Sequence, residues 1–213
     1  MRRLLALLLP LSHLPSLAWA NQRELLQEGD LIFQVSNSAQ SEPIQRATGS
    51  LWSHVGILLN HQGKLAVFEA GQRVCWTSIE DWIAQGRDGL FAVKRLRHAE
   101  TRITDAVRQK WRELASAWEG KSYDLQFLKE DDSLYCSELV WKMYRRTLGV
   151  AIGQWKPLRT YNVADAMVRQ ILEERYAGRP PWEEPMIAPG AVFDSPLLEL
   201  VTLQGAPESK LED

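Results

Sequence analysis

The stretch SHVGILLNHQGKLAVFEA, residues 53–70, decides the fold. Two runs rich in apolar and β-branched residues, 54–60 and 64–70, lie on either side of a short loop that contains Gly63. This is the pattern of an antiparallel β-hairpin. The sequence therefore predicts a hairpin at the centre of the sheet.

The register of this hairpin brings two polar residues together. If Leu59 and Lys64 close the hairpin, Glu69 is the cross-strand partner of His54, and directly opposed residues have Cβ atoms about 5 Å apart. A loop of odd length would instead turn Glu69 to the other face of the sheet. We expect the first arrangement, in which Glu69 accepts a hydrogen bond from one imidazole nitrogen of His54.

The rest of the chain predicts a mixture of strands and helices. Further strands are expected at residues 30–35, 73–77 and 91–97, and helices at residues 41–47, 78–86, 104–118, 136–148 and 162–176. Ser41 is the expected N-cap of the first helix. Short strands flanked by helices, without regular βαβ alternation, indicate an α+β fold with an antiparallel sheet packed against helices. From about residue 177 the chain is rich in Pro and Gly, which predicts an irregular C-terminal tail.

The first twenty residues have the order of a secretory signal peptide. A basic start at Arg2 and Arg3 is followed by a short apolar run and by small residues up to Ala20. The alternative, a retained membrane anchor, needs about 20 apolar residues in one helix. We therefore predict cleavage after Ala20, export to the periplasm, and a single domain over residues 21–213.

Composition excludes several classes of function. Without Arg2 and Arg3 the chain has 23 basic and 27 acidic residues, and no cluster of Lys and Arg indicates nucleic acid as a partner. Cys75 and Cys136 are the only cysteines, and their spacing with the histidines fits no metal-binding pattern. We expect no metal and no cofactor, while a Cys75–Cys136 disulfide stays possible in an oxidising compartment.

Cys136 begins the predicted helix 136–148. A thiol at a helix N-terminus lies in the partial positive charge of the helix dipole, which favours the nucleophilic thiolate. Cys75 lies inside a strand between apolar neighbours, where a structural role is expected. Together with His54 and Glu69, Cys136 would complete a thiol, base and carboxylate suited to acyl transfer. Its backbone N–H and the nearby hydroxyl of Tyr123 are candidate oxyanion donors.

Four short motifs resemble those of the NlpC-type cell-wall peptidases. They are Gly29–Phe33 (GDLIF), Ser53–Ile57 (SHVGI), Gly120–Tyr123 (GKSY) and Tyr135–Leu139 (YCSEL). In the NlpC-type enzymes the Tyr and Cys motifs come first, whereas here they follow the other two. The chain thus resembles the circularly permuted, papain-like branch that includes the YiiX/YebB-like proteins and the lecithin:retinol acyltransferase relatives. The resemblance to the YiiX/YebB-like proteins extends to residues 67–70 and 188–196.

The resemblance implies a role for each site residue. Cys136 would be the nucleophile, His54 the base, Glu69 the group that orients His54, and Tyr123 a residue near the oxyanion site. The acyltransferase relatives use a second His where this chain has Glu69, so their lipid chemistry does not transfer directly.

Three functions remain open from the sequence. The leading one is hydrolysis of an amide bond in the cell envelope, such as a stem-peptide bond of peptidoglycan. The second keeps the same residues but takes a lipid or N-acyl substrate, although Trp111, Trp118 and Trp141 are expected to fill the core rather than an acyl groove. The third is an envelope-binding protein without catalysis. Residues 158–163 and 179–182 could rim the cleft.

Overall fold

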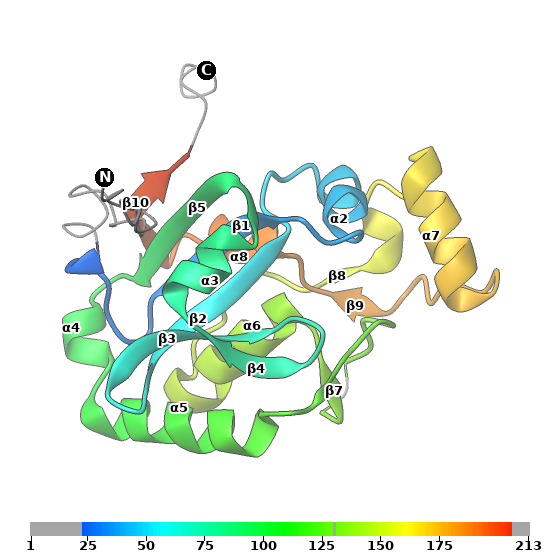
Figure 1. The fold of residues 1–213 in the computed structure, drawn as a ribbon. Helices are drawn as coiled ribbons and strands as arrows, with labels where there is room; N and C mark the ends of the chain where they lie inside the picture. Colours follow the sequence, from blue (N-terminus) through cyan, green and yellow to red (C-terminus); the bar gives the residue numbers. More distant parts are fainter. Residues whose placement is uncertain (1–22, 130, 206–213) are drawn as a thin grey trace, which may run out of the picture.

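A single antiparallel sheet organises the molecule (Figure 1). The structure, a computed structural model, describes residues 23–129 and 131–205. The strand order is β10-β5-β1-β2-β3-β4, with every neighbouring pair antiparallel. The strands are β1 (Leu31–Ser36), β2 (His54–His61), β3 (Lys64–Ala70), β4 (Val74–Thr77), β5 (Gly86–Leu96) and β10 (Leu198–Gln204).

Helices cover both faces of this sheet. They are α2 (Ser41–Thr48), α3 (Ile79–Ala84), α4 (Ala99–Arg102), α5 (Asp105–Trp118), α6 (Cys136–Leu148), α7 (Ala166–Tyr176) and α8 (Pro189–Phe193). The remaining short elements are β6 (Ser122–Tyr123), β7 (Ser133–Leu134), β8 (Lys156–Pro157), the 3₁₀ turn η1 (Leu158–Thr160) and β9 (Pro185–Met186).

Alternation along the strands produces two apolar layers. On one face Leu31, Phe33 and their neighbours pack with α5 and α6, and on the other Ile32 packs with residues of α3. Trp111 of α5 is fully buried in the first layer. Trp118 and Trp141 also pack in or against that layer, so the prediction that these three tryptophans fill the core is confirmed.

Side-chain caps mark the start of three of the helices, α3, α5 and α7. In the predicted helix 104–118, Thr104 accepts a hydrogen bond from the backbone N–H of Val107 at the start of α5. Ser41, however, is not a cap: α2 begins there, but its hydroxyl lies 2.7 Å from the hydroxyl of Ser53 instead. Helix α7 begins later than predicted because Asp165 caps the backbone N–H groups of Met167 and Val168.

The predicted irregular tail is wrong in part, because three regular elements interrupt it. After residue 177 the chain forms β9, α8 and β10, and β10 pairs with β5 at the edge of the main sheet. The Pro residues mark connections and the first turn of α8, a position that tolerates Pro because no backbone donor is lost there. Leu198 and Thr202, both buried, attach β10 to the rest of the fold.

The hairpin forms as predicted, but its register differs from the prediction by two residues. His61 pairs with Lys64, and the two-residue turn uses Gln62 and Gly63, both with positive φ. Continuing the ladder places Gly56, not His54, opposite Glu69. Because the shift is even, Glu69 keeps the face that the prediction gave it.

The two ends of the chain, residues 1–22 and 206–213, lie outside the described ranges. The predicted signal peptide, residues 1–20, lies outside the described residues. Within the described ranges no helix is both long and apolar enough to cross a membrane. Cys75 and Cys136 are both free thiols, so they form no disulfide with each other.

Candidate active site

Cys136 is the first residue of α6, as predicted. The helix packs against β2 and β3, which carry His54 and Glu69. The side chain of Cys136 is only 2% exposed, but it forms part of the wall of a pocket. A reactant would therefore reach the sulfur through that pocket.

The residues on either side of Cys136 are tied to a distant segment. The hydroxyl of Tyr135 accepts a hydrogen bond of 3.1 Å from the backbone N–H of Ile187, and the hydroxyl of Ser137 donates one of 2.7 Å to the carbonyl of the same residue. These bonds hold the start of α6 against the chain between β9 and α8. Tyr135 and Ser137 of the YCSEL motif therefore have a structural role, which is to hold the start of the helix that carries Cys136.

His54 lies between Cys136 and Glu69. Its Nε2 atom is 2.5 Å from Oε2 of Glu69, and the side chain also hydrogen-bonds with Cys136. Since Nε2 faces the carboxylate, Nδ1 is the ring nitrogen left for the sulfur. Burial by itself would lower the pKa of His54, but hydrogen bonds and charge interactions with Cys136 and then with Glu69 outweigh it, so the pKa is raised.

Two further side chains hold the carboxylate of Glu69. Thr77 of β4 donates its hydroxyl to Oε1 at 2.6 Å, and the indole N–H of Trp82 in α3 donates to Oε2 at 3.1 Å. The Trp82 ring also stacks on His54, with centroids 5.8 Å apart. Burial would raise the pKa of Glu69, but His54, Thr77 and Trp82 together lower it, so the carboxylate stays ionised.

Tyr123 reaches the same sulfur from β6. Tyr123 is half-buried as a residue; its hydroxyl hydrogen-bonds with Cys136, and burial of this group together with the nearby sulfur raises its pKa well above the usual value. The phenol is therefore a protonated donor at neutral pH. All four residues that the sequence singled out, Cys136, His54, Glu69 and Tyr123, thus come together at one place.

One motif residue turns out to be structural rather than part of the site. Asp30 is 1% exposed and forms an ion pair with Arg95, with Oδ1 and Nε 2.7 Å apart. The neighbouring Gly29 accepts a hydrogen bond from the hydroxyl of Tyr144 in α6. The GDLIF motif therefore anchors α6 and β5 to β1.

Glu138 is buried in α6, two residues after Cys136. It is fully inaccessible and forms an ion pair with Lys142 one turn later, with 2.8 Å between Oε1 and Nζ. Burial raises the pKa of Glu138 to about 7, and Lys142 opposes this only in part. Such a group changes charge near neutral pH inside the helix that carries Cys136.

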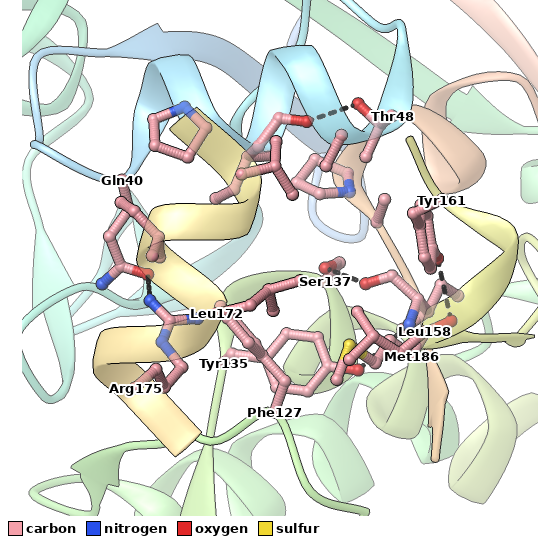
Figure 2. A pocket seen from close by; sticks show the side chains of 18 of the residues that line it. Gln40, Thr48, Phe127, Tyr135, Ser137, Leu158, Tyr161, Leu172, Arg175 and Met186 are labelled. Atoms are coloured by element: carbon pink, nitrogen blue, oxygen red, sulfur yellow. Dashed lines mark hydrogen bonds between the residues drawn. The ribbon is translucent and has the colours of Figure 1, made fainter. Parts of the chain in front are cut away.

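The pocket beside Cys136 has a volume of about 110 Å³ and an almost wholly apolar wall (Figure 2). Its polar hydroxyls mostly face the backbone: Thr48 donates to Ile44, Ser137 to Ile187, and Tyr161 to Met186. Residues 158–163, a predicted rim, contribute Leu158, Tyr161 and Val163. The apolar wall further comprises Pro43, Ile44, Ala47, Phe127, Val168, Ile171, Leu172, Met186, Ile187, Ala188 and Pro189.

The permuted papain-like amidases, the YaeF/YiiX or C92 family, match residues 25–202 of this chain. The chain belongs to this family. C92 membership accounts for the permuted order of the motifs, and by family it makes the protein a cysteine hydrolase of amide bonds. The assignment of individual residues still rests on their geometry.

Two C92-type relatives cover nearly the whole chain. YiiX of Escherichia coli strain K12, an uncharacterized protein, is 39% identical over 94% of this chain and 96% of its own length. A crystal structure of YiiX from Escherichia coli O157:H7, described as a metalloprotein, has a TM-score of 0.78 and 40% identity over 84% of this chain and 97% of that one. Within residues 23–129 and 131–205 of the present chain, no three His, Cys, Asp or Glu side chains form a group that could hold a metal ion.

Sequence reasoning missed Thr77, Trp82 and the apolar pocket. Thr77 follows Trp76 in β4, and its position opposite Val67 in the adjacent strand is visible only once the β3–β4 register is known. Trp82 lies in a short helix that reads as an ordinary amphipathic segment. The pocket joins residues from α2, α6 and α7, and no local pattern marks such an assembly.

Proposed function

We propose that this protein is an exported cysteine amidase in which Cys136 is the nucleophile, His54 the acid–base group and Glu69 the residue that orients His54. The observation that carries this proposal is the hydrogen-bonded series Cys136–His54–Glu69 at the N-terminus of α6. Export to the periplasm rests on the sequence of residues 1–20 alone.

The reaction follows from this geometry. The Cys136 thiolate attacks the amide carbonyl carbon, and the oxyanion that forms accepts hydrogen bonds from the Cys136 backbone N–H and the Tyr123 hydroxyl. Imidazolium His54 gives its proton to the amine nitrogen as the C–N bond breaks, which leaves a thioester. A water molecule then loses a proton to His54, attacks the thioester and releases the carboxylic acid and Cys136.

The apolar pocket bears on the substrate. A peptidoglycan stem-peptide bond is one candidate, because an exported amidase would meet it in the envelope. The wall of the pocket, however, offers mainly aliphatic and aromatic surface at the sulfur, which favours an N-acyl amide with an apolar acyl chain. We therefore put the N-acyl amide first as a substrate class and keep the stem-peptide bond as the alternative.

One experiment tests both the residues and the substrate class. The mature protein and the variants Cys136→Ala and His54→Ala are incubated with muropeptides and with N-acyl amino acids of graded chain length, and products are read by mass spectrometry. Acid–base groups contribute about 10²- to 10⁴-fold, so either variant should fall to near background. Cys75→Ala is the matched control, because Cys75 lies outside the pocket. Turnover by Cys136→Ala close to wild type would refute the mechanism, and cleavage of muropeptides alone would select the alternative substrate.

A further inference from the structure

Arg175 brings a positive charge to an otherwise uncharged wall. It lies in the last turn of α7 and lines the pocket that holds Cys136. Apart from Cys136 itself, the other described residues that line this pocket are apolar or neutral polar. Figure 2 shows Arg175 beside Gln40 at one side of the pocket, with Tyr161 at the other.

The guanidinium is held in place without an acidic partner. Its Nη2 atom donates to Oε1 of Gln40 at 3.2 Å, and its Cζ atom lies 4.6 Å from the centroid of the Phe127 ring. Among the described residues it forms no ion pair with an Asp or Glu side chain. Asp124 is near enough for Arg175 to oppose the burial that raises the pKa of Asp124, but the two are not paired.

A structural role alone explains this placement poorly. A cation near the C-terminus of α7 interacts favourably with the helix dipole, but an exposed side chain would serve equally well. Arg175 is instead half-buried against an aromatic ring, with N–H groups left over after its hydrogen bonds to Gln40 and Tyr176. A charge beside apolar surface is costly unless a counter-charge offsets it. An anionic group on the ligand would supply that counter-charge.

Two aromatic side chains lie between Arg175 and the sulfur of Cys136. The Phe127 ring, on which Arg175 lies, contacts Tyr123 with ring centroids 6.4 Å apart, and Tyr123 hydrogen-bonds with Cys136. Arg175 and the sulfur are thus separated by two aromatic rings. A substrate that reaches both must carry its charged group several bonds from the scissile carbonyl, with apolar atoms between.

We propose that Arg175 selects amide substrates in which a carboxylate or phosphate accompanies the apolar portion. This inference rests on the proposed function, since it concerns the same pocket. The guanidinium would bind the anionic oxygens through its free N–H groups, in the paired geometry that arginine offers to carboxylate and phosphate. The apolar wall would hold the intervening chain.

Binding is measured first, so that the inference can be tested without turnover. The Cys136→Ala protein is titrated by calorimetry with the p-nitroanilide of octanedioic acid, with the methyl ester of that anilide and with octyl phosphate. The two anions should bind about 10- to 100-fold more tightly than the neutral ester, the range for a hydrogen bond to a charged group. Adding Arg175→Gln should abolish that preference, and Arg175→Lys should keep part of it.

Turnover supplies the second readout. For the otherwise wild-type protein, kcat/KM is compared between N-octanoyl-alanine and its amide, and between the p-nitroanilide of octanedioic acid and its methyl ester. These pairs place the anion on the amine side and on the acyl side of the scissile bond, respectively. Arg175→Gln should selectively reduce kcat/KM for the free-acid anilide, in which the methylene chain separates the anion from the scissile carbonyl. Arg179→Gln, which removes an exposed charge outside the pocket, is the matched control.

The outcomes separate the two proposals. Equal binding of anionic and neutral ligands to Cys136→Ala, no binding of either, or an equal effect of Arg179→Gln, would overturn the role of Arg175. Selective binding that depends on Arg175, but without Cys136-dependent turnover, would uphold the anion site and refute the amidase. A uniform loss of both members of every pair in Arg175→Gln would show a structural role only.

Discussion

The Nε2 atom of His54 lies 2.5 Å from Oε2 of Glu69, although these residues are not opposite each other in the β2–β3 ladder. The ladder places Gly56 opposite Glu69. A Cβ atom on Gly56 would stand at ordinary contact distance, 3.5 Å, from the Glu69 Cβ, but only 2.4 Å from Cγ1 of Val67. With no side chain at Gly56, the carboxylate has room to lean diagonally toward His54, and any larger residue there would crowd the strand beside the pair.

Replacing Glu69 by Gln should shift the alkaline limb of the activity profile. The carboxylate helps raise the pKa of His54, so its loss lowers that pKa. Imidazolium His54 is lost as pH rises through this pKa, and activity that needs it should then decline at lower pH than in the wild type. The pH dependence of kcat/KM measures this. An unchanged alkaline limb would show that Glu69 does not act through His54.

Replacing Thr77 by Val should affect the acid limb instead. The Thr77 hydroxyl lowers the pKa of Glu69 by bonding its charged form, so its removal raises that pKa. Glu69 then becomes protonated at higher pH, so on acidification activity should be lost at a higher pH than in the wild type. Thr77→Ser retains the hydroxyl and should restore the profile. A Thr77→Val profile that matches wild type would argue against this positioning role.

Glu138 should make folding stability fall as pH rises toward 7. Its folded pKa of about 7 exceeds the ordinary 4.5, so the folded state holds the proton more tightly between these values. The stabilisation is complete below the unfolded pKa and is lost as pH rises through the folded one. Urea unfolding at pH 5 and pH 8 should show a decline of about 1–3 kcal/mol that Glu138→Gln removes. Equal declines in both proteins would contradict this.

Gly29→Ala should destabilise the fold far more than Gly63→Ala. Both glycines have positive φ, but a Cβ on Gly29 would lie 2.7 Å from the Trp111 ring, whereas one on Gly63 would meet nothing within 4 Å. We expect losses of about 2–4 kcal/mol and about 1 kcal/mol, respectively, since only Gly29→Ala adds overpacking to backbone strain. Thermal denaturation of the two variants measures the difference. Similar losses of stability in the two variants would mean that the Trp111 ring moves aside from the new methyl group at little cost.

The sequence predicted what depends on local periodicity and on residue chemistry. The hairpin, the helix that begins at Cys136 and the α+β class were all foreseen, because apolar spacing and capping residues mark them. The hairpin register was missed because Gln62 and Gly63 both adopt positive φ and shorten the turn. The strand β10 was not predicted because the residues that lead into it are rich in Pro and Gly, and the sequence gives no sign of its pairing with β5.

The same distinction between predicted and unpredicted features applies to the residues of the site. Cys136, His54, Glu69 and Tyr123 could be named from motif chemistry, and their convergence is a matter of geometry that the fold supplies. Thr77 could not be named in this way. It bonds Glu69 across a strand pairing that has no sequence signature.

The bonds from Tyr135 and Ser137 to Ile187 make the placement of the sulfur depend on a segment some fifty residues further along the chain. A polypeptide cut between α7 and β9 would still contain every proposed reactive group. It would lack the covalent connection to Ile187, whose backbone hydrogen bonds hold the first turn of α6. Proteolysis in that stretch would accordingly be an irreversible way to silence the protein while leaving its reactive side chains untouched.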